Sequence, residues 1–563
     1  MNKAILATAG LWLALALAAP AGAEPATLWR GGPIITMAGD VPQTVEAVVA
    51  RDGKILFAGD LAAARKAAGA GVVEHDLAGK TLLPAFVDAH SHFASAVQEA
   101  GRLNLAGPEA GPITDNASLI AAVRRFAANI PKGQWVVATR YDQEALAEKR
   151  YITRAELDAA LPDHKVALLH VSGHGMVVNS RALAAAGLVD GQPAPEGGVV
   201  TADAQGRLTG GLFETAMGPV NAVLPQKTAA DKLAALDDAQ DLYLREGFTF
   251  AQDAATQPAD LAFLTSEAAR GKLKLDLAVL PLSLAGLDDL YANPALRPHV
   301  WLGRVKLQGV KFILDGSPQA RTAFFTRDYA RGSPDGSHPW RGRPLAGDAQ
   351  VQAMMKEAHA RGWQIFVHAN GDAAIDMAIH AFDALGIKAA DDRRPIVIHS
   401  QFVRPDQLKD YARIGVGPAL FSNHTFYWAD VHRSNFGPEV TDFISPFAAA
   451  RAAGLTPSNH SDYPVTSLDT RFQLWTAMAR TSRTGVVSGP GQRESAYRAL
   501  QALTTGPAWQ TFEETRRGRI APGLLADFVI LDADPLTTPV GSIRAITVTE
   551  TIKEGQTVWR RAK

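Results

Sequence analysis

The stretch LLPAFVDAHSHF, residues 82–93, carries an apolar run into an aspartate and then two histidines one residue apart. Alternate residues of an extended strand share a face, so we expect Asp88, His90 and His92 on one face at a strand end. Two imidazoles held side by side form half of a metal site. Two ordinary polar residues at the start of a loop are the other interpretation, and this pattern alone leaves both open.

The middle of the chain repeats the arrangement of an apolar strand that ends in a histidine or an aspartate. Examples are GWQIFVHANGD, RRPIVIHSQFV, VGPALFSNHT and TPSNHSDYPV. Strands that are apolar on both faces are typical of a buried parallel sheet. In α/β barrels the reactive residues lie at the carboxyl ends of the strands. The residues at such positions are His90, His92, His368, His399, His424 and Asp462.

The spacing of these residues fits an eight-unit barrel, in which one strand–helix unit takes about 31 residues. His368 and His399 are one such unit apart, and the segment RVKLQGVKFILDGS, residues 304–317, is expected to supply strand four. The chain between His92 and strand four is longer than three units require. We therefore expect an insertion at about residues 100–215 that forms a cap or lid subdomain.

Both ends of the chain are rich in short β-like runs. Asp52-Gly53 and Glu554-Gly555 each separate two such runs, which is a hairpin signal. We predict one small β-domain built from residues 24–82 and 515–563, flanking a central α/β domain of residues 83–514. Two separate β-appendages are the alternative.

The first residues, MNKAILATAGLWLALALAAPAGAEPA, have the pattern of a secretory signal peptide. Lys3 precedes a short apolar core, and Ala21-Gly22-Ala23 is a cleavage signal. We predict removal of residues 1–23 and a periplasmic or secreted mature protein with no membrane association. An uncleaved membrane anchor is the alternative interpretation.

The formal net charge of −1 argues against nucleic acid or an anionic membrane as partner. The chain has no cysteine, so it forms no disulfide, and a bound metal must be held by nitrogen and oxygen ligands. A small-molecule substrate is the expected partner. Whether the protein forms a homo-oligomer stays open.

Lys311 lies in GVKFILDG, among apolar residues. A charged lysine in an apolar strand is costly unless it is paired, neutralised or modified. The ordinary alternatives are a side chain that reaches outward to solvent or an ion pair with Asp315. Lys306 is a rival in the same segment, but its neighbours are more polar, so the pattern favours a functional Lys311.

The ordered motifs FVDAHSHF, GVKFILDGS, FVHANGDAAID, IHSQFV and SNHSDYPV resemble the amidohydrolase superfamily. Together with GHGMVVNSRAL and GRIAPGLLADFVILDADPL they are similar to its family 3 branch, which contains the N-substituted formamide deformylases. The resemblance implies a (β/α)8 TIM barrel with an inserted cap subdomain and a small β-sandwich domain built from both termini. It also implies metal ligands at His90, His92, Lys311, His368, His399 and Asp462.

The chemistry implied is that of a metal-dependent hydrolase acting on carbon–nitrogen bonds other than peptide bonds. One or two divalent ions, with Zn²⁺ suited to imidazole and oxygen ligands, would activate water for attack on an amide, an N-substituted formamide or a cyclic amide. Lys311 would be N6-carboxylated, and Asp462 would carry the proton to the leaving nitrogen. An ester or lactone hydrolase, or a non-catalytic metal-binding regulatory protein, are the alternatives.

Four other residues are candidates for contact with substrate. His424 follows strand seven and is expected to polarise the scissile carbonyl or bind substrate, with a capping role as the alternative. His174 is expected to reach the site from the insertion or to be structural. His460 shares a strand face with Asp462 and either supports the ligands or contacts substrate. Glu214 caps a helix or contacts substrate, and the sequence does not choose between these roles.

Overall fold

The computed structural model describes residues 25–283, 287–294 and 296–562. The predicted signal peptide, residues 1–23, lies outside the described residues. None of the helices described is both long enough and apolar enough to cross a membrane.

Strands from both ends of the chain share one eight-stranded sheet, ordered β24-β23-β22-β5-β1-β2-β3, with β4 on β1. β5 pairs antiparallel with β22, so that Leu83 faces Val529 and the two chain ends are joined. The β2–β3 hairpin turns at Asp52 and Gly53, which both have positive φ, as a tight hairpin requires. The strands are β1 (Thr27–Ile35), β2 (Thr44–Arg51), β3 (Lys54–Gly59), β4 (Val73–Asp76), β5 (Thr81–Pro84), β22 (Phe528–Leu531), β23 (Val548–Lys553) and β24 (Gln556–Arg560).

Two five-stranded sheets form the centre of an α/β fold, ordered β15-β16-β14-β13-β6 and β17-β18-β19-β20-β21. Every pairing in them is parallel except β15–β16. A parallel bridge between Leu282 and Lys311 links the two sheets. The strands are β6 (Phe86–Val87), β13 (Phe248–Thr256), β14 (Asp276–Pro281), β15 (Trp301–Leu302), β16 (Val305–Leu307), β17 (Gly309–Ile313), β18 (Gln364–Ala369), β19 (Ile396–His399), β20 (Gly417–Leu420) and β21 (Ser458–Asn459).

The segment predicted as a single strand four is divided in the structure. β16 ends at Leu307 and pairs with β14, whereas β17 begins at Gly309 and pairs with β18. A Cβ atom at Gly309 would stand 2.4 Å from the carbonyl oxygen of Gln364, so only glycine permits the close backbone approach at this bend.

Helices connect and cover the central sheets, and their apolar faces join the strands in one large core cluster. Those helices are α2 (Phe93–Glu99), α7 (Ala229–Leu244), α8 (Pro258–Thr265), α9 (Glu267–Lys272), α10 (Asp288–Ala292), α11 (Asp348–Ala360), α12 (Asp372–Ala384), α13 (Pro405–Ile414), α16 (Phe447–Ala452), α17 (Thr470–Ala479) and α18 (Ala496–Gln501). Four more complete the outer set: α1 (Leu61–Ala68), α14 (His424–Tyr427), α15 (Ala429–Thr441) and α19 (Thr505–Gln510).

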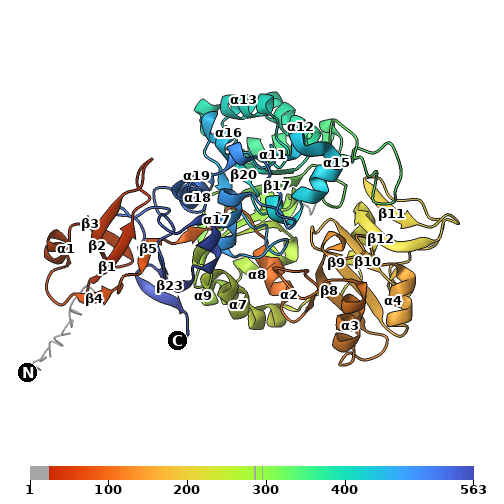
Figure 1. Cartoon of the computed structure of the whole chain (residues 1–563), viewed down its shortest axis with the longest axis horizontal. Helices are drawn as coiled ribbons and strands as arrows, with labels where there is room; N and C mark the ends of the chain where they lie inside the picture. Colours follow the sequence, from red (N-terminus) through yellow and green to blue (C-terminus); the bar gives the residue numbers. More distant parts are fainter. Residues whose placement is uncertain (1–24, 284–286, 295, 563) are drawn as a thin grey trace, which may run out of the picture.

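A separate six-stranded sheet, ordered β11-β12-β10-β9-β8-β7, lies within residues 103–214. In Figure 1 it occupies the opposite end of the molecule from the β1–β5 sheet, with the central sheets in between. Its strands are β7 (Leu103–Asn104), β8 (Trp135–Tyr141), β9 (Lys165–His170), β10 (Gly175–Val178), β11 (Gly198–Ala202) and β12 (Leu208–Glu214). The helices around it are α3 (Asn116–Ala127), α4 (Arg154–Ala160), α5 (Ser180–Ala185) and α6 (Gly218–Asn221).

Candidate functional site

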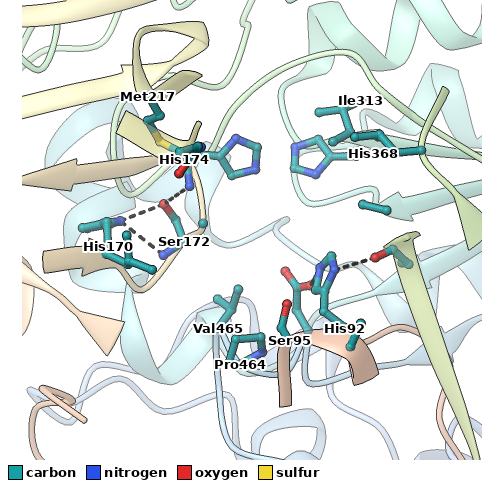
Figure 2. A pocket seen from close by; sticks show the side chains of 18 of the residues that line it. His92, Ser95, His170, Ser172, His174, Met217, Ile313, His368, Pro464 and Val465 are labelled. Carbon is teal, nitrogen blue, oxygen red and sulfur yellow. Dashed lines mark hydrogen bonds and ion pairs between the residues drawn. The ribbon is translucent and has the colours of Figure 1, made fainter. Parts of the chain in front are cut away.

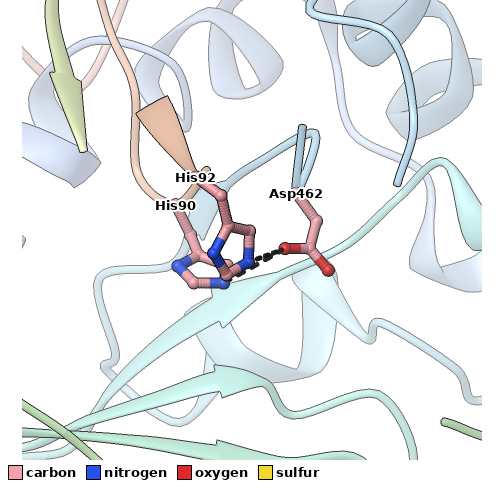
Figure 3. Close-up of side chains that lie close together, drawn as sticks. All are labelled: His90, His92 and Asp462. Atoms are coloured by element: carbon pink, nitrogen blue, oxygen red, sulfur yellow. Dashed lines mark hydrogen bonds and ion pairs between the residues drawn. The ribbon is translucent and has the colours of Figure 1, made fainter. Parts of the chain in front are cut away.

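His90, His92 and Asp462 meet where the chain leaves β6 and β21 (Figure 3). The Nε2 atoms of both histidines lie 3.2 Å from Oδ1 of Asp462. His90 and Asp462 are buried, and one ligand atom from each of the three residues lies within 4.8 Å of the others. This compact set of two imidazoles and one carboxylate has the donor types and spacing of a metal site.

The protonation of both imidazoles is set by acceptors on β13. His90 Nδ1 lies 3.0 Å from Oε1 of Gln252, and His92 Nδ1 lies 2.8 Å from the backbone oxygen of Ala254. Carbonyl oxygens only accept hydrogen bonds, so each Nδ1 donates and each Nε2 keeps its lone pair. His90 Nε2 is buried without an aligned hydrogen-bond partner, which fits a nitrogen that coordinates a metal ion.

Electrostatics favours neutral imidazole beside ionised carboxylate. Burial, and then the charge of Lys311, hold the pKa of His90 well below its usual value. Burial by itself would raise the pKa of Asp462, but the adjacent imidazoles of His399 and His90 keep that pKa well below its usual value. A neutral nitrogen donor and an anionic oxygen donor are the forms that bind a metal ion.

A second pair of imidazoles stands on the neighbouring strands β18 and β19. His368 Nδ1 lies 3.0 Å from His399 Nε2, and His368 Nε2 lies 3.1 Å from the backbone oxygen of Gly316. With the Nε2 proton donated to that oxygen, His368 Nδ1 accepts the hydrogen bond from His399 Nε2. His399 Nδ1 is buried without a hydrogen bond, 3.9 Å from Oδ2 of Asp462, so Asp462 joins the two pairs.

Lys311 lies at the same site, and the residue is only 1% exposed. Within the described residues its Nζ makes no hydrogen bond or ion pair, which excludes both the solvent-exposed and the Asp315-paired alternatives. Asp315 accepts the backbone N–H groups of Phe324, Asn370 and Gly371 instead. Burial lowers the pKa of Lys311 to about 7, against the opposing charge of Asp462.

The rival Lys306 has a structural partner. Its Nζ lies 2.7 Å from Oε1 of the buried Glu513. A paired buried lysine needs no modification or ligand to compensate its charge. Lys311 is therefore the uncompensated lysine of the two.

A cavity of about 730 Å³ opens onto these residues, and residues between 102 and 221 supply much of its wall. His174 Nδ1 lies 2.8 Å from Oε2 of Glu214, and the His174 ring is 4.8 Å from the His368 ring across the cavity (Figure 2). Burial opposes the protonation of His174, but the Glu214 carboxylate outweighs it and raises the pKa of His174. The sequence candidates His174 and Glu214 thus form one pair at the cavity.

His424 and His460 are not among the lining residues of that cavity, and their contact with substrate stays a prediction. Both rings pack against Phe421, whose ring lies 4.7 Å from the His424 ring and 4.5 Å from the His460 ring. His424 Nδ1 instead lies 3.1 Å from Nε2 of His432. His460 packs 5.2 Å from the ring of His90, where it supports a proposed ligand.

Gln252, His170 and Arg140 are site residues that were not among the sequence candidates. Gln252 was not singled out, although a glutamine inside the apolar strand FTFAQDAAT is a usable signal. His170 ends β9 in the same pattern as the other strand-end histidines, lines the cavity and contacts Ser172 Oγ at 2.7 Å. Arg140 lines the cavity too, and no local pattern marks it.

Comparisons with known proteins give the family. The model described as "Amidohydrolase family" (family 3) matches residues 73–559. The chain is 26% identical to YtcJ of Bacillus subtilis over 95% of this chain and 99% of that protein. It is 26% identical to an N-substituted formamide deformylase of Arthrobacter pascens, over 92% of this chain and 95% of that protein.

Among solved structures, an uncharacterized metal-dependent hydrolase from Pyrococcus horikoshii shares the fold, with a TM-score of 0.72. It is 23% identical, over 92% of this chain and 99% of that one. The family match covers most of the chain and confirms the resemblance read from the motifs. The protein therefore belongs to amidohydrolase family 3.

Proposed function

We propose that this protein is a metal-dependent hydrolase that cleaves a carbon–nitrogen bond, other than a peptide bond, in a small amide-like molecule. The observation that carries the proposal is the convergence of His90 Nε2 and His92 Nε2 on the Asp462 carboxylate. The opposite nitrogen of each ring is held as a donor, so both free lone pairs face one point.

The residues fit one or two divalent ions, and Zn²⁺ suits imidazole nitrogen with carboxylate oxygen. His90, His92 and Asp462 would hold one ion, and His368 and His399 would hold a second. Lys311 would bridge them as a carbamate, because its lowered pKa leaves a neutral amine that adds to the carbon of CO₂ and releases a proton. Electron density for the carboxyl group at high resolution tests this modification.

When bound, a divalent ion lowers the pKa of a water molecule and polarises a carbonyl oxygen. Asp462 takes the proton from the attacking water and delivers it to the leaving nitrogen, since an unprotonated amide nitrogen is a poor leaving group. The His174–Glu214 pair lies across the cavity from His368, where the imidazole can hydrogen-bond the developing oxyanion. The insertion would exclude water as a cap over the reaction.

The fold proposal is a closed (β/α)8 barrel with this cap and a β-sandwich domain. It is supported by the Leu282–Lys311 bridge and by the hydrogen bond from Asp462 N to His90 O, which connects the first and last strand ends. The proposed mature enzyme is exported after cleavage at Ala23.

The name of the Arthrobacter pascens relative makes N-substituted formamides the first substrates to assay. Purified protein would be stripped with a chelator, reloaded with Zn²⁺, and assayed on formamides, acyclic amides and cyclic amides, each with the matching ester or lactone. Amide turnover that needs metal, and that His90→Ala abolishes together with metal content, is expected. His380→Ala, on the exposed face of α12, is the matched control.

Turnover confined to the esters would replace the proposal with an ester or lactone hydrolase. Stoichiometric metal without turnover of any compound would favour a non-catalytic metal-binding protein. Full activity in His90→Ala would contradict the metal site itself.

A further inference from the structure

Besides the proposed metal ligands, the cavity wall contains two arginines, Arg102 and Arg140. One carboxylate faces them, because Arg140 Nε lies 3.7 Å from Oε2 of Glu99. The Arg102 side chain makes no hydrogen bond or ion pair within the described residues. This part of the wall therefore carries more positive than negative charge.

The other acidic groups of the wall have partners of their own. Glu214 is held by His174, and Asp260 lies 2.6 Å from Nζ of Lys232. Asp253 accepts hydrogen bonds from Thr256 Oγ1 and the backbone of Ala94. None of these carboxylates is bonded to Arg102 or Arg140, so both guanidinium groups keep donors for a ligand.

Arg140 reaches the cavity because β8 contains an extra residue. Ala138 pairs with Leu168 and Tyr141 pairs with His170, so β8 advances three residues where β9 advances two. Arg140 adopts a φ of 62°, in a region that non-glycine residues rarely occupy. A β-bulge with this backbone conformation redirects a side chain, and such bulges are common beside active sites.

The effect of the bulge follows from the alternation of side chains between the two faces of a strand. Val136 and Ala138 point into the apolar cluster formed with α3 and α4. In a regular strand Arg140 would be the next residue on that face. Tyr141 takes that place instead, with its hydroxyl accepting the backbone N–H of Ile152 at 2.8 Å. The extra residue thus turns a charged side chain out of an apolar core and into the cavity.

Arg140 is held in the cavity wall by segments that adjoin the proposed ligands in the chain. Its guanidinium lies 4.7 Å from the centre of the Tyr463 ring, and Tyr463 directly follows Asp462. Glu99 ends α2, the helix that begins directly after His92. Arg140 and Asp462 line the same cavity, so a small molecule that spans it can contact both residues.

We infer that Arg102 and Arg140 form a binding site for a carboxylate of the substrate, whose class is an amide that also carries a carboxylate, such as an N-acylated amino acid. That the substrate also contains an amide rests on the proposed function. Planar guanidinium groups match carboxylate geometry and bind it through two parallel hydrogen bonds. Leu169, Val171 and Met176 line the same cavity and suit an apolar side chain on that amino acid.

A binding experiment tests the site without requiring turnover. N-methylsulfonylleucine, in both enantiomers, replaces the scissile amide by a sulfonamide that resists hydrolysis. N-(3-methylbutyl)methanesulfonamide is the same molecule without the carboxylate. Calorimetric titration of the metal-loaded protein would compare the two ligands in wild type, Arg140→Gln, Arg102→Gln and the control Arg125→Gln, an exposed arginine of α3.

We expect wild type to bind one enantiomer of the carboxylate ligand at least about tenfold more tightly than the neutral ligand. Both cavity variants should lose most of that preference, and Arg125→Gln should keep it. Equal affinity of wild type for the two ligands would overturn the inference. A preference for the carboxylate ligand that survives in both cavity variants would overturn it too. The same holds if neither ligand binds at millimolar concentration. Failure to hydrolyse any amide would instead contradict the proposed function, because these ligands report binding alone.

Discussion

Asp462 and His90 are connected twice: the backbone N–H of Asp462 donates to the backbone oxygen of His90 at 3.2 Å, and Asp462 Oδ1 lies 3.2 Å from His90 Nε2. The backbone bond joins the ends of two strand segments that are far apart in the sequence. It holds the carboxylate and the imidazole at a set distance before any ligand binds. Preorganisation of this kind lowers the cost of binding a metal and of reaching the transition state.

Replacing Asp462 by asparagine should separate proton transfer from binding. The amide keeps the size and one oxygen of the carboxylate but cannot take a proton, so kcat should fall by about 10² or more while KM changes little. Steady-state kinetics with parallel metal analysis would measure both effects. Near-full turnover with metal bound would show that another group carries the proton.

Replacing Gln252 by leucine should weaken metal binding although Gln252 is not a proposed ligand. Leucine removes the acceptor for the His90 Nδ1 proton, so the ring is free to take the other tautomer or to rotate. Metal affinity should fall by about 10- to 100-fold, as measured by competition with a chromogenic chelator. Gln252→Glu, which keeps an acceptor, should recover affinity; equal affinity in wild type and Gln252→Leu would show that the hydrogen bond does not orient the ring.

Lys311 should make the stability of the metal-free, uncarboxylated protein depend on pH. Its folded-state pKa of about 7 lies below the ordinary value of 10.5, so between these values the unfolded chain binds more protons than the folded one. The free energy of unfolding should therefore rise with pH from about 7 upward, relative to Lys311→Met. Urea titrations at pH 7 and pH 9.5 in CO₂-free buffer measure this difference. A parallel pH dependence of the two proteins would contradict a buried, unpaired lysine.

Export predicts a defined mature terminus. Cleavage after Ala23, at the Ala21-Gly22-Ala23 signal, should leave Glu24 as the first residue of protein recovered from the periplasm. N-terminal sequencing checks this, and replacement of Ala23 by a bulky residue should retain the longer precursor. Membrane-bound material that still begins at Met1 would contradict the prediction.

The sequence by itself determined the features that local patterns encode. Alternation of apolar residues and strand-end histidines marked six residues as candidates, and their order along the chain identified the family. The Asp52-Gly53 hairpin was predictable for the same reason, because a tight turn depends on a few adjacent residues. Lys311 stood out because a charge inside an apolar strand conflicts with its immediate neighbours.

Only the tertiary structure decided how those residues face one another. The oxygen that sets the His92 tautomer belongs to the backbone of Ala254, and a backbone carbonyl leaves no mark in a residue pattern. His424 and His460 pack against Phe421 and do not line the cavity, whereas the bulge at Arg140 adds an arginine to its wall. These outcomes depend on contacts between segments far apart in the chain, which form when the elements pack, whereas a strand or turn depends on its own residues.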